Sequence, residues 1–204
     1  MKNLRTSKKC RNDKKNLVQV LQLGGIAVVP TDTLYGIVCS VEDAQSIKKL
    51  YSIKGRTETK PFIVLIYSFS DLLRFGISLS PKERAFLSRA WPGKVSIVLP
   101  CKKRSYSYLT RGGETLAFRM PKSPFIRLLL KKTGPLVAPS ANPEGLRPAE
   151  TIREARAYFA DFVDIYESAG KRLRGKPSTL LKLHSDGTCD VLRTGAINIK
   201  NLIS

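Results

Sequence analysis

The sequence predicts a single α/β domain built on an open, twisted, mixed sheet. Short apolar runs typical of buried strands alternate with amphipathic segments that carry helix start and stop signals, and this interleaving indicates an α/β fold. No internal repeat or low-complexity tract interrupts the alternation. A length of 204 residues is enough for one domain with a sizeable core.

The first sixteen residues differ in character from the rest of the chain. They offer almost nothing apolar to bury, and Met1 to Lys15 carries seven Lys or Arg residues, so residues 1–16 are predicted to be a basic, flexible arm. The arm lacks the hydrophobic core that a secretory signal needs. The folded domain is predicted to span residues 17–204.

The predicted elements follow from hydrophobic periodicity. Apolar residues at helical spacing indicate helices, whereas short, wholly apolar runs indicate buried strands. In chain order we expect a helix over 17–23, a strand over 26–29, a helix over 43–53, a strand over 62–67, helices over 71–75 and 81–90, strands over 95–99 and 116–120, a helix over 124–133, a strand over 136–138, a helix over 152–159, and strands over 162–166, 179–183 and 190–192.

Capping residues mark the boundaries of these helices. Gly55 is expected to end the helix over 43–53, and Ser70 to cap the short helix that follows it. In a capping box, a Ser or Thr caps the first turn and a Glu three residues later bonds back. This pattern predicts boxes at Ser80 to Glu83 and at Thr151 to Glu154.

The charge of the chain favours a polyanionic partner or substrate. Lys and Arg number 36 against 16 Asp and Glu, which gives a net charge of +20 and a pI near 10.1. Nucleic acid is the first class of partner that such a balance suggests, and a nucleotide is the second.

Other residue types exclude several classes of protein. The four cysteines include no Cys-x-x-Cys pair, so a zinc site and a disulfide framework are not indicated, and reduced thiols favour a cytoplasmic location. No apolar run approaches the roughly 20 residues of a membrane span. The single histidine, His184, excludes mechanisms that need two, and no nucleophile elbow supports a Ser-His-Asp triad.

One phosphate-binding motif is nearly present. Gly170 to Lys176 has the two glycines and the lysine of a P-loop at the required spacing. However, Pro177 replaces the hydroxyl residue that would hold magnesium, and the sequence after it is typical of a strand rather than a helix. We therefore interpret this segment as a basic surface loop.

Three cations stand together between residues 54 and 60. If this loop is extended, alternation places Lys54 and Arg56 on the same side, both partly exposed, with Lys60 close by. Arg offers a planar fork and Lys a point charge, which together suit a phosphate ligand. On charge density alone, a solvated basic loop is the favoured alternative.

Neutral polar residues follow two other predicted strands. Ser140 and Asn142 come after the strand over 136–138, and open α/β sheets bind ligands outside the carboxyl ends of their strands. The alternative for this pair is an ordinary turn. Thr31 follows the first strand, where a turn or a helix cap is the alternative, and Arg119 ends another strand, where a surface charge is the alternative.

Read together and in order, these segments resemble the YrdC family of threonylcarbamoyl-AMP synthases. The residues that carry the resemblance are Pro30 to Gly36 (PTDTLYG), Lys54 to Arg56 with Lys60 and Pro61, Trp91 to Gly93, Arg119 to Pro121, Ser140 to Asn142, Pro177 to Thr179 and Arg193 to Gly195. They extend over nearly all of the predicted domain. No single segment is specific, but seven in the family's order are.

The resemblance implies a fold, a reaction and partners. The fold is an open, twisted α/β sheet with helices around a large, basic, concave site. The reaction joins L-threonine, bicarbonate and ATP into L-threonylcarbamoyladenylate and releases pyrophosphate, the first step in making threonylcarbamoyl-adenosine in tRNA. It also implies Mg²⁺ held mainly through phosphates. The basic surface separately predicts contact with RNA or tRNA. The sequence leaves open whether the product is handed over to a threonylcarbamoyl transferase.

The resemblance also implies roles for particular residues. Lys54 and Arg56 are expected to hold the triphosphate and the carbamate, with Lys60 assisting. The other ATP-binding residues are then Ser140, Asn142, Ser178 and Arg193, and the threonine-binding residues are Thr31, Tyr35 and Arg119.

Three features depart from the family's pattern. Lys182 stands where many relatives carry an acid, and Glu144 stands where Ser is common. The chain ends near Ser204, without the additional C-terminal domain of the long members, so the short, single-domain form is expected.

Two other functions compete with the synthase. The first is a non-catalytic, basic RNA-binding module of the same fold, supported by the arm and by the cluster Lys171, Arg172, Arg174 and Lys176. Retention of polar residues such as Thr31 argues against it. The second is a carbamoyl-transfer module like those inside larger hydrogenase-maturation proteins, against which the absence of fused domains argues.

Overall fold

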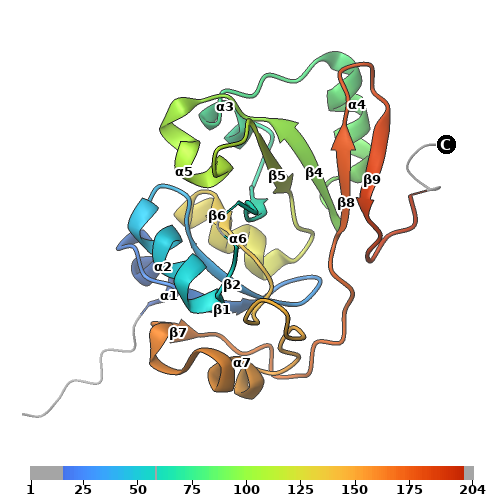
Figure 1. Ribbon diagram of the computed structural model, residues 1–204. Coiled ribbons are helices and arrows are strands. Elements are labelled where there is room, and N and C mark those ends of the chain that lie inside the picture. Colours follow the sequence, from blue (N-terminus) through green and yellow to red (C-terminus); the bar gives the residue numbers. More distant parts are fainter. Residues whose placement is uncertain (1–15, 58, 200–204) are drawn as a thin grey trace, which may run out of the picture.

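The computed structural model describes residues 16–57 and 59–199, in which nine strands form one mixed sheet (Figure 1). The strand order is β7-β1-β2-β6-β3-β5-β4-β8-β9. The strands are β1 (Ala27–Pro30), β2 (Tyr35–Ser40), β3 (Val64–Leu65), β4 (Val95–Pro100), β5 (Thr115–Arg119), β6 (Leu136–Val137), β7 (Ile165–Tyr166), β8 (Thr179–Leu183) and β9 (Cys189–Arg193). The predicted fold class, an open mixed α/β sheet, is confirmed.

Parallel and antiparallel pairs alternate irregularly across the sheet. The pairs β1–β7, β3–β5 and β4–β8 are parallel, and the other neighbours are antiparallel. β1 and β2 form a hairpin in which Pro30 lies opposite Tyr35. β2 was not predicted, because its wholly apolar run is only Ile37 to Cys39.

Helices connect most of the strands. They are α1 (Leu17–Gln22), α2 (Ala44–Lys54), α3 (Asp71–Arg74), α4 (Pro81–Ala90), α5 (Ser107–Thr110), α6 (Pro124–Thr133) and α7 (Ile152–Phe159), with 3-10 turns η1 (Arg104–Tyr106) and η2 (Ala160–Phe162). The short elements η1 and α5 were not predicted. No helix among the described residues has the length and apolar character needed to cross a membrane.

The predicted caps are confirmed in part. Both halves of the capping box form at Ser80 and Glu83. The prediction for Ser70 is wrong, because its side chain makes no cap bond; instead the carboxylate of Asp71 accepts the N–H groups of residues 67 and 68. Thr151 caps α7 as predicted. The second half of its capping box does not form, because the Glu154 carboxylate accepts the N–H of residue 150, at 2.8 Å, instead of that of residue 151.

The start of the folded part also differs from the prediction. Residues 1–15 of the predicted arm lie outside the described residues. Asn16, the last residue of that predicted arm, belongs to the fold, because its side chain accepts the Val18 N–H at 3.0 Å and caps α1.

The sheet is buried on both faces at its β1–β2–β6–β3 end. Alternate residues of β1 enter different cores: Val28 belongs to the core that contains residues of α2, α3, α4 and α7, whereas Ala27 and Val29 belong to the core that contains residues of α1 and α6. β3 divides in the same way, with Val64 in the first core and Leu65 in the second. Period-two alternation between two apolar faces explains why these strands read as continuous apolar runs.

The other end of the sheet has a helix layer on one face only. Phe118, Ile97 and Leu181 of β5, β4 and β8 enter the core that contains α4, but their neighbours Ala117 and Leu180 stay partly exposed. In Figure 1, β8 and β9 lie at the opposite end of the molecule from β7 and α7. The uncovered face between these ends forms the floor of the candidate site.

The two serines that were predicted to be caps provide a test of the local structure. Ser80→Ala removes the hydroxyl that accepts the Glu83 N–H, while the backbone N–H of residue 80 can still donate to the Glu83 carboxylate, so it should lower the free energy of unfolding by about 1 kcal/mol. Ser70→Ala removes only an exposed contact with Ser68, and its effect should stay within about 0.5 kcal/mol. Urea denaturation followed by circular dichroism measures both, and equal losses would contradict this assignment of caps.

Candidate active site

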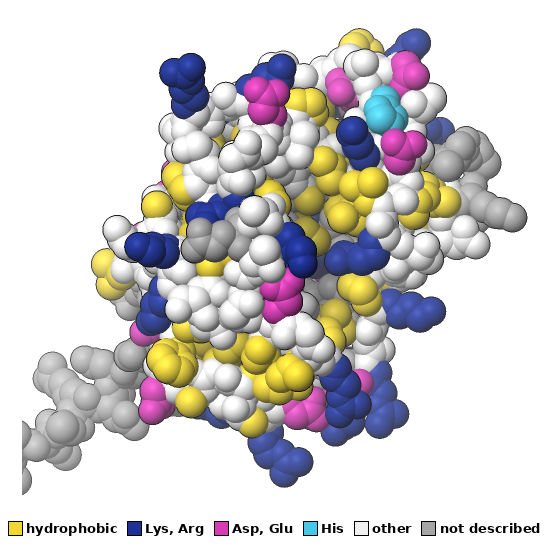
Figure 2. All heavy atoms as spheres, in the orientation of Figure 1, with side chains coloured by type: hydrophobic (Ala, Val, Ile, Leu, Met, Phe, Trp, Pro, Cys, Tyr) yellow, Lys and Arg dark blue, Asp and Glu magenta, His cyan; other side chains and the backbone are white. Residues whose placement is uncertain are grey.

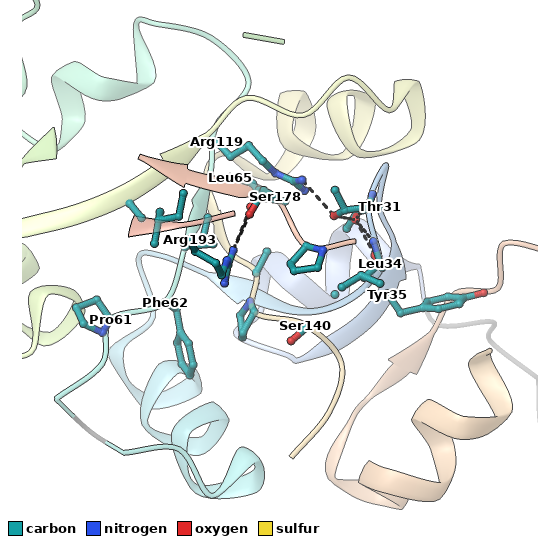
Figure 3. A pocket seen from close by; sticks show the side chains of 18 of the residues that line it. Thr31, Leu34, Tyr35, Pro61, Phe62, Leu65, Arg119, Ser140, Ser178 and Arg193 are labelled. Atoms are coloured by element: carbon teal, nitrogen blue, oxygen red, sulfur yellow. Dashed lines mark hydrogen bonds between the residues drawn. The ribbon is translucent and has the colours of Figure 1, made fainter. Parts of the chain in front are cut away.

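A cavity opens on the uncovered face of the sheet (Figure 3). It is lined by the β1–β2 turn, the segment leading into β3, the end of β5, the segment after β6, the start of β8 and the end of β9. Figure 2 shows this side of the molecule hollowed near its centre, with Lys or Arg side chains beside the hollow. Of the predicted site residues, those that line the cavity are Thr31, Tyr35, Arg56, Arg119, Ser140, Ser178 and Arg193.

The β1–β2 turn is fixed by the hydroxyl of Thr31. Thr31 Oγ1 accepts the N–H groups of Thr33 and Leu34, both at 3.1 Å, and donates to the Leu34 carbonyl at 2.6 Å. Such hydroxyl-to-backbone bonds stabilise turns. This wall of the cavity is therefore set by the turn itself.

Arg119 is buried where β5 ends beside this turn. Its guanidinium lies 3.3 Å from the carboxylate of Asp32 and donates to Thr33 Oγ1 at 3.1 Å. Burial lowers the pKa of Arg119, while the Asp32 charge raises it and the Arg193 charge lowers it. The role of Asp32 was not predicted, although opposite charges at the ends of two strands were a usable signal.

Ser178 and Arg193 come together because β8 and β9 form a hairpin. The guanidinium of Arg193 donates to the Ser178 carbonyl at 2.9 Å, as the dashed line in Figure 3 marks. Ser178 Oγ lies 2.8 Å from Ser96 Oγ of β4. Partial burial, and then the charge of Arg56, lower the pKa of Arg193.

Arg56 completes a group of three arginines on the cavity. Its Nε donates to the Lys60 carbonyl at 3.2 Å, and its guanidinium lies 5.3 Å from the centre of the Phe62 ring. Phe62 also lines the cavity; it falls outside β3, whereas the sequence predicted a strand from residue 62. The aromatic wall was therefore missed.

The arrangement of charge around the cavity is unbalanced. Of these three arginines, only Arg119 has a carboxylate within 4 Å among the described residues. The charges of Arg56 and Arg193 repel one another, as do those of Arg193 and Arg119. An anion bound between them would relieve this repulsion, so the geometry suits a ligand with more than one negative charge.

Lys54 does not lie where the sequence analysis placed it. The prediction of an extended, partly exposed Lys54 beside Arg56 is wrong, because α2 continues through Lys54 and turns only at Gly55, whose φ is +57°. The side chain is 3% exposed, and its ammonium donates to the carbonyls of Ser140, at 2.6 Å, and Asn142. Burial, and then Arg56, lower the pKa of Lys54 to about 7.

Lys60 and Asn142 also lie off the cavity wall. Lys60 is exposed and forms an ion pair with Glu144 at 3.0 Å. The amide of Asn142 is buried and donates to the carbonyls of Pro143 and Leu146, at 2.8 and 2.7 Å. Both side chains therefore support the loops around the cavity in this structure.

Tyr35 lines the cavity while its ring points away from it (Figure 3). The hydroxyl accepts the N–H of Ala169 at 2.9 Å, which ties the connection between β7 and β8 to the hairpin. That connection contains the near P-loop. It is followed by β8 rather than a helix, which confirms its rejection as a P-loop.

The chain matches a known protein family over most of its length. A family model described as "Telomere recombination", the Sua5/YciO/YrdC domain, matches residues 19–195. The chain belongs to this family. The resemblance inferred from the seven short segments is thereby confirmed.

Curated relatives of this Sua5/YciO/YrdC chain share one name. A threonylcarbamoyl-AMP synthase of Bacillus subtilis is 35% identical over 144 residues, which cover 70% of this chain and 41% of that protein. A threonylcarbamoyl-AMP synthase of Thiobacillus denitrificans is 34% identical over 165 residues, which cover 80% of this chain and 87% of the relative. The chain therefore matches less than half of one relative's length and nearly all of the other's.

Solved structures of the family agree with the fold. The crystal structure of P. abyssi Sua5 complexed with L-threonine superposes with a TM-score of 0.83 at 26% identity, covering 91% of this chain and 54% of that one. The crystal structure of E. coli YciO gives a TM-score of 0.80 at 24% identity, covering 91% and 90%. The second likeness concerns the fold alone.

Lys54 and Arg56 should differ sharply in their effect on stability. Lys54→Ala leaves one buried and one partly buried carbonyl without their donor, so the free energy of unfolding should fall by about 2 kcal/mol. Arg56→Ala removes a partly exposed side chain, and the loss should stay below about 0.5 kcal/mol. Urea titration of both variants beside the wild type measures the difference. A Lys54→Ala variant as stable as the wild type would contradict the conclusion that this ammonium stabilises the segment after β6.

Proposed function

We propose that this protein synthesises L-threonylcarbamoyladenylate from L-threonine, bicarbonate and ATP, with release of pyrophosphate. The observation that carries the proposal is the group of three arginines on one cavity, of which Arg56 and Arg193 have no carboxylate within 4 Å among the described residues. ATP supplies the negative charges that such a cavity lacks. The shared name of the curated relatives supports the same reaction.

We assign the nucleotide to the side of the cavity that contains Arg56 and Arg193. In this assignment Arg56 and Arg193 face the phosphates, and the hydroxyls of Ser140 and Ser178, which also line the cavity, serve as hydrogen-bonding groups. Phe62 offers an apolar face beside Arg56. This side accounts for most of the predicted ATP-binding residues.

We assign threonine to the opposite side, where Thr31 and Arg119 lie. The guanidinium of Arg119 is held by Asp32 and Thr33, so it is already oriented before the carboxylate of an amino acid arrives. The bound threonine in the P. abyssi relative supports an amino-acid site in this fold. Tyr35 contributes its backbone to this wall, while its ring secures the hairpin from behind.

The reaction needs no protein nucleophile. Bicarbonate supplies carbon dioxide by loss of hydroxide. The amine of threonine adds to the carbon dioxide and loses a proton, which gives a carbamate and, with the hydroxide, water. A carbamate oxygen then attacks the α-phosphorus, and the bond to the departing pyrophosphate breaks. Positioning and fixed positive charges lower the barrier of such an in-line displacement, which is the contribution of Arg56 and Arg193.

Lys54 and Asn142 have an indirect part in this proposal. Lys54 holds the carbonyls of residues 140 and 142, so it positions the Ser140 hydroxyl rather than touching ATP. Asn142 stabilises the same loop from its other side. We therefore treat both as positioning residues, and Arg56 as the catalytic cation of this segment.

The described part of the chain offers magnesium no ligand set of its own. Among residues 16–57 and 59–199, no group of three or more His, Cys, Asp or Glu side chains is arranged to hold a metal ion. Mg²⁺ commonly binds through substrate phosphates and retains several waters. We propose that it enters with ATP.

We also propose contact with RNA. The basic cluster between residues 171 and 176 supports this contact less than the sequence suggested. Arg172 forms ion pairs with Glu150 and Glu154 at 2.9 and 3.4 Å, and Arg174 lies 3.8 Å from Glu150. Neutralised arginines favour RNA binding less than free ones do. We propose tRNA contact through other basic surfaces and handover of the product to a transferase.

Threonine-dependent release of pyrophosphate tests the proposed activity. With ATP, bicarbonate and Mg²⁺ present, pyrophosphate should form only when L-threonine is added, because the carbamate is the attacking group. Arg56→Ala should reduce this rate about a hundredfold or more, since one lost transition-state donor typically costs that much. A folded protein that releases no pyrophosphate with threonine would sink the synthase proposal and favour the RNA-binding alternative.

Two conservative substitutions test which end of the cavity binds which substrate. Arg193→Lys and Arg119→Lys keep the charge but remove the planar fork. Arg193→Lys should raise the KM for ATP about tenfold, and Arg119→Lys the KM for threonine by about the same factor, because each loses a charge-assisted bond. Steady-state kinetics with each substrate varied in turn measures both KM values. A raised KM for threonine in Arg193→Lys and for ATP in Arg119→Lys would refute the assignment.

A further inference from the structure

The loop between α2 and β3 contains an anion-binding site that the protein itself occupies. The carboxylate of Glu144 accepts the Thr57 N–H at 2.7 Å and the Thr57 hydroxyl at 3.3 Å, and its other oxygen lies 3.0 Å from Lys60 Nζ. A backbone N–H, a hydroxyl and an ammonium are also the donors that phosphate oxygens use. An internal carboxylate therefore fills a site with the chemistry of a phosphate site.

Glu144 is held in this position by its backbone as well. Its N–H donates to the carbonyl of Lys54 at 2.7 Å, so the residue is anchored where α2 ends. The bond from Thr57, and then the bond from Lys60, lower the pKa of Glu144 to about 2. The carboxylate is consequently ionised throughout the neutral range.

The carboxylate of Glu144 holds Lys60 away from the cavity that Arg56 lines. Arg56 lines the cavity, whereas Lys60, four residues later, is exposed and faces Glu144 instead. The two are nevertheless adjacent, because Arg56 Nε donates to the Lys60 carbonyl at 3.2 Å. Lys60 would need to release Glu144 before it could bind an anion at Arg56.

We propose that Glu144 is an internal competitor that sets the affinity of the cavity for polyphosphate. A ligand with several phosphates displaces the carboxylate from Lys60, which then joins Arg56 at the ligand. Exposed ion pairs contribute little to stability, so this exchange is readily reversible. The inference rests on the proposed function, because it assumes that the phosphates of ATP lie beside Arg56.

Binding of inorganic tripolyphosphate, measured by calorimetry without threonine, tests the competition apart from turnover. Glu144→Gln should bind about two- to fivefold more tightly than the wild type, since it no longer offers Lys60 a competing charge. Glu114→Gln is the matched control, because it removes the same charge from an exposed pair with Lys102. Its affinity should equal that of the wild type.

A double-mutant cycle shows whether the effect passes through Lys60. In a Lys60→Met background, Glu144→Gln should no longer tighten binding, because the cation it releases is absent. In the wild type, the amide resonance of Thr57 should also shift with tripolyphosphate, because the carboxylate that accepts this N–H loses its ion pair with Lys60.

The possible outcomes separate this inference from the proposed function. Equal or weaker binding by Glu144→Gln, or a gain that persists without Lys60, would overturn the competitor role while the polyphosphate site stands. An equal gain in Glu114→Gln would overturn it too, because the effect would then be one of net charge. No binding by any variant would overturn the polyphosphate site and this inference with it.

Discussion

The buried ammonium of Lys54 is the contact on which the geometry of the cavity depends. Removing a charge from water is costly, and here two carbonyls of the segment after β6 offset part of that cost. The residual penalty is visible in the pKa of Lys54, which burial and then Arg56 lower to about 7. This contact ties the end of α2 to Ser140. The loops that carry Arg56 and Ser140 consequently have fixed relative positions.

The cavity concentrates positive charge that the fold does not neutralise. Arg56 and Arg193 disfavour each other's charge, and Arg119 is compensated only by Asp32 among the described residues. Such an arrangement lowers the stability of the empty protein, which is a common property of binding sites. The same repulsion becomes affinity when an anion enters, because the ligand removes an unfavourable interaction as well as adding favourable ones. Glu144 moderates this affinity at the neighbouring cation.

Local signals predicted the elements of the fold better than the directions of its side chains. The capping box at Ser80 was readable because all its partners lie within four residues. Ser70 resembled it in sequence, but a neighbouring aspartate satisfied the local backbone instead. The position of Lys54 could not be predicted, since one more residue of helix turned an expected surface side chain inward, toward carbonyls 86 and 88 residues away. Seven of the ten predicted site residues line one cavity, but this clustering was supplied by resemblance rather than by periodicity.

The sheet explains how a chain with one histidine can be suited to a demanding displacement. Thr31 follows β1, Arg119 ends β5, Ser178 precedes β8 and Arg193 ends β9, so hydrogen-bond register sets the spacing between the two ends of the cavity. Register resists displacement wherever one face of a strand is buried, as in β1, β5 and β8, because a slip of one residue would turn the apolar side chains to the wrong face. Groups fixed in this way need little reorganisation when charge develops on a transferring phosphoryl group. Rigid placement of arginines can therefore replace acid–base residues, provided that the attacking group brings its own nucleophilic oxygen, as a carbamate does.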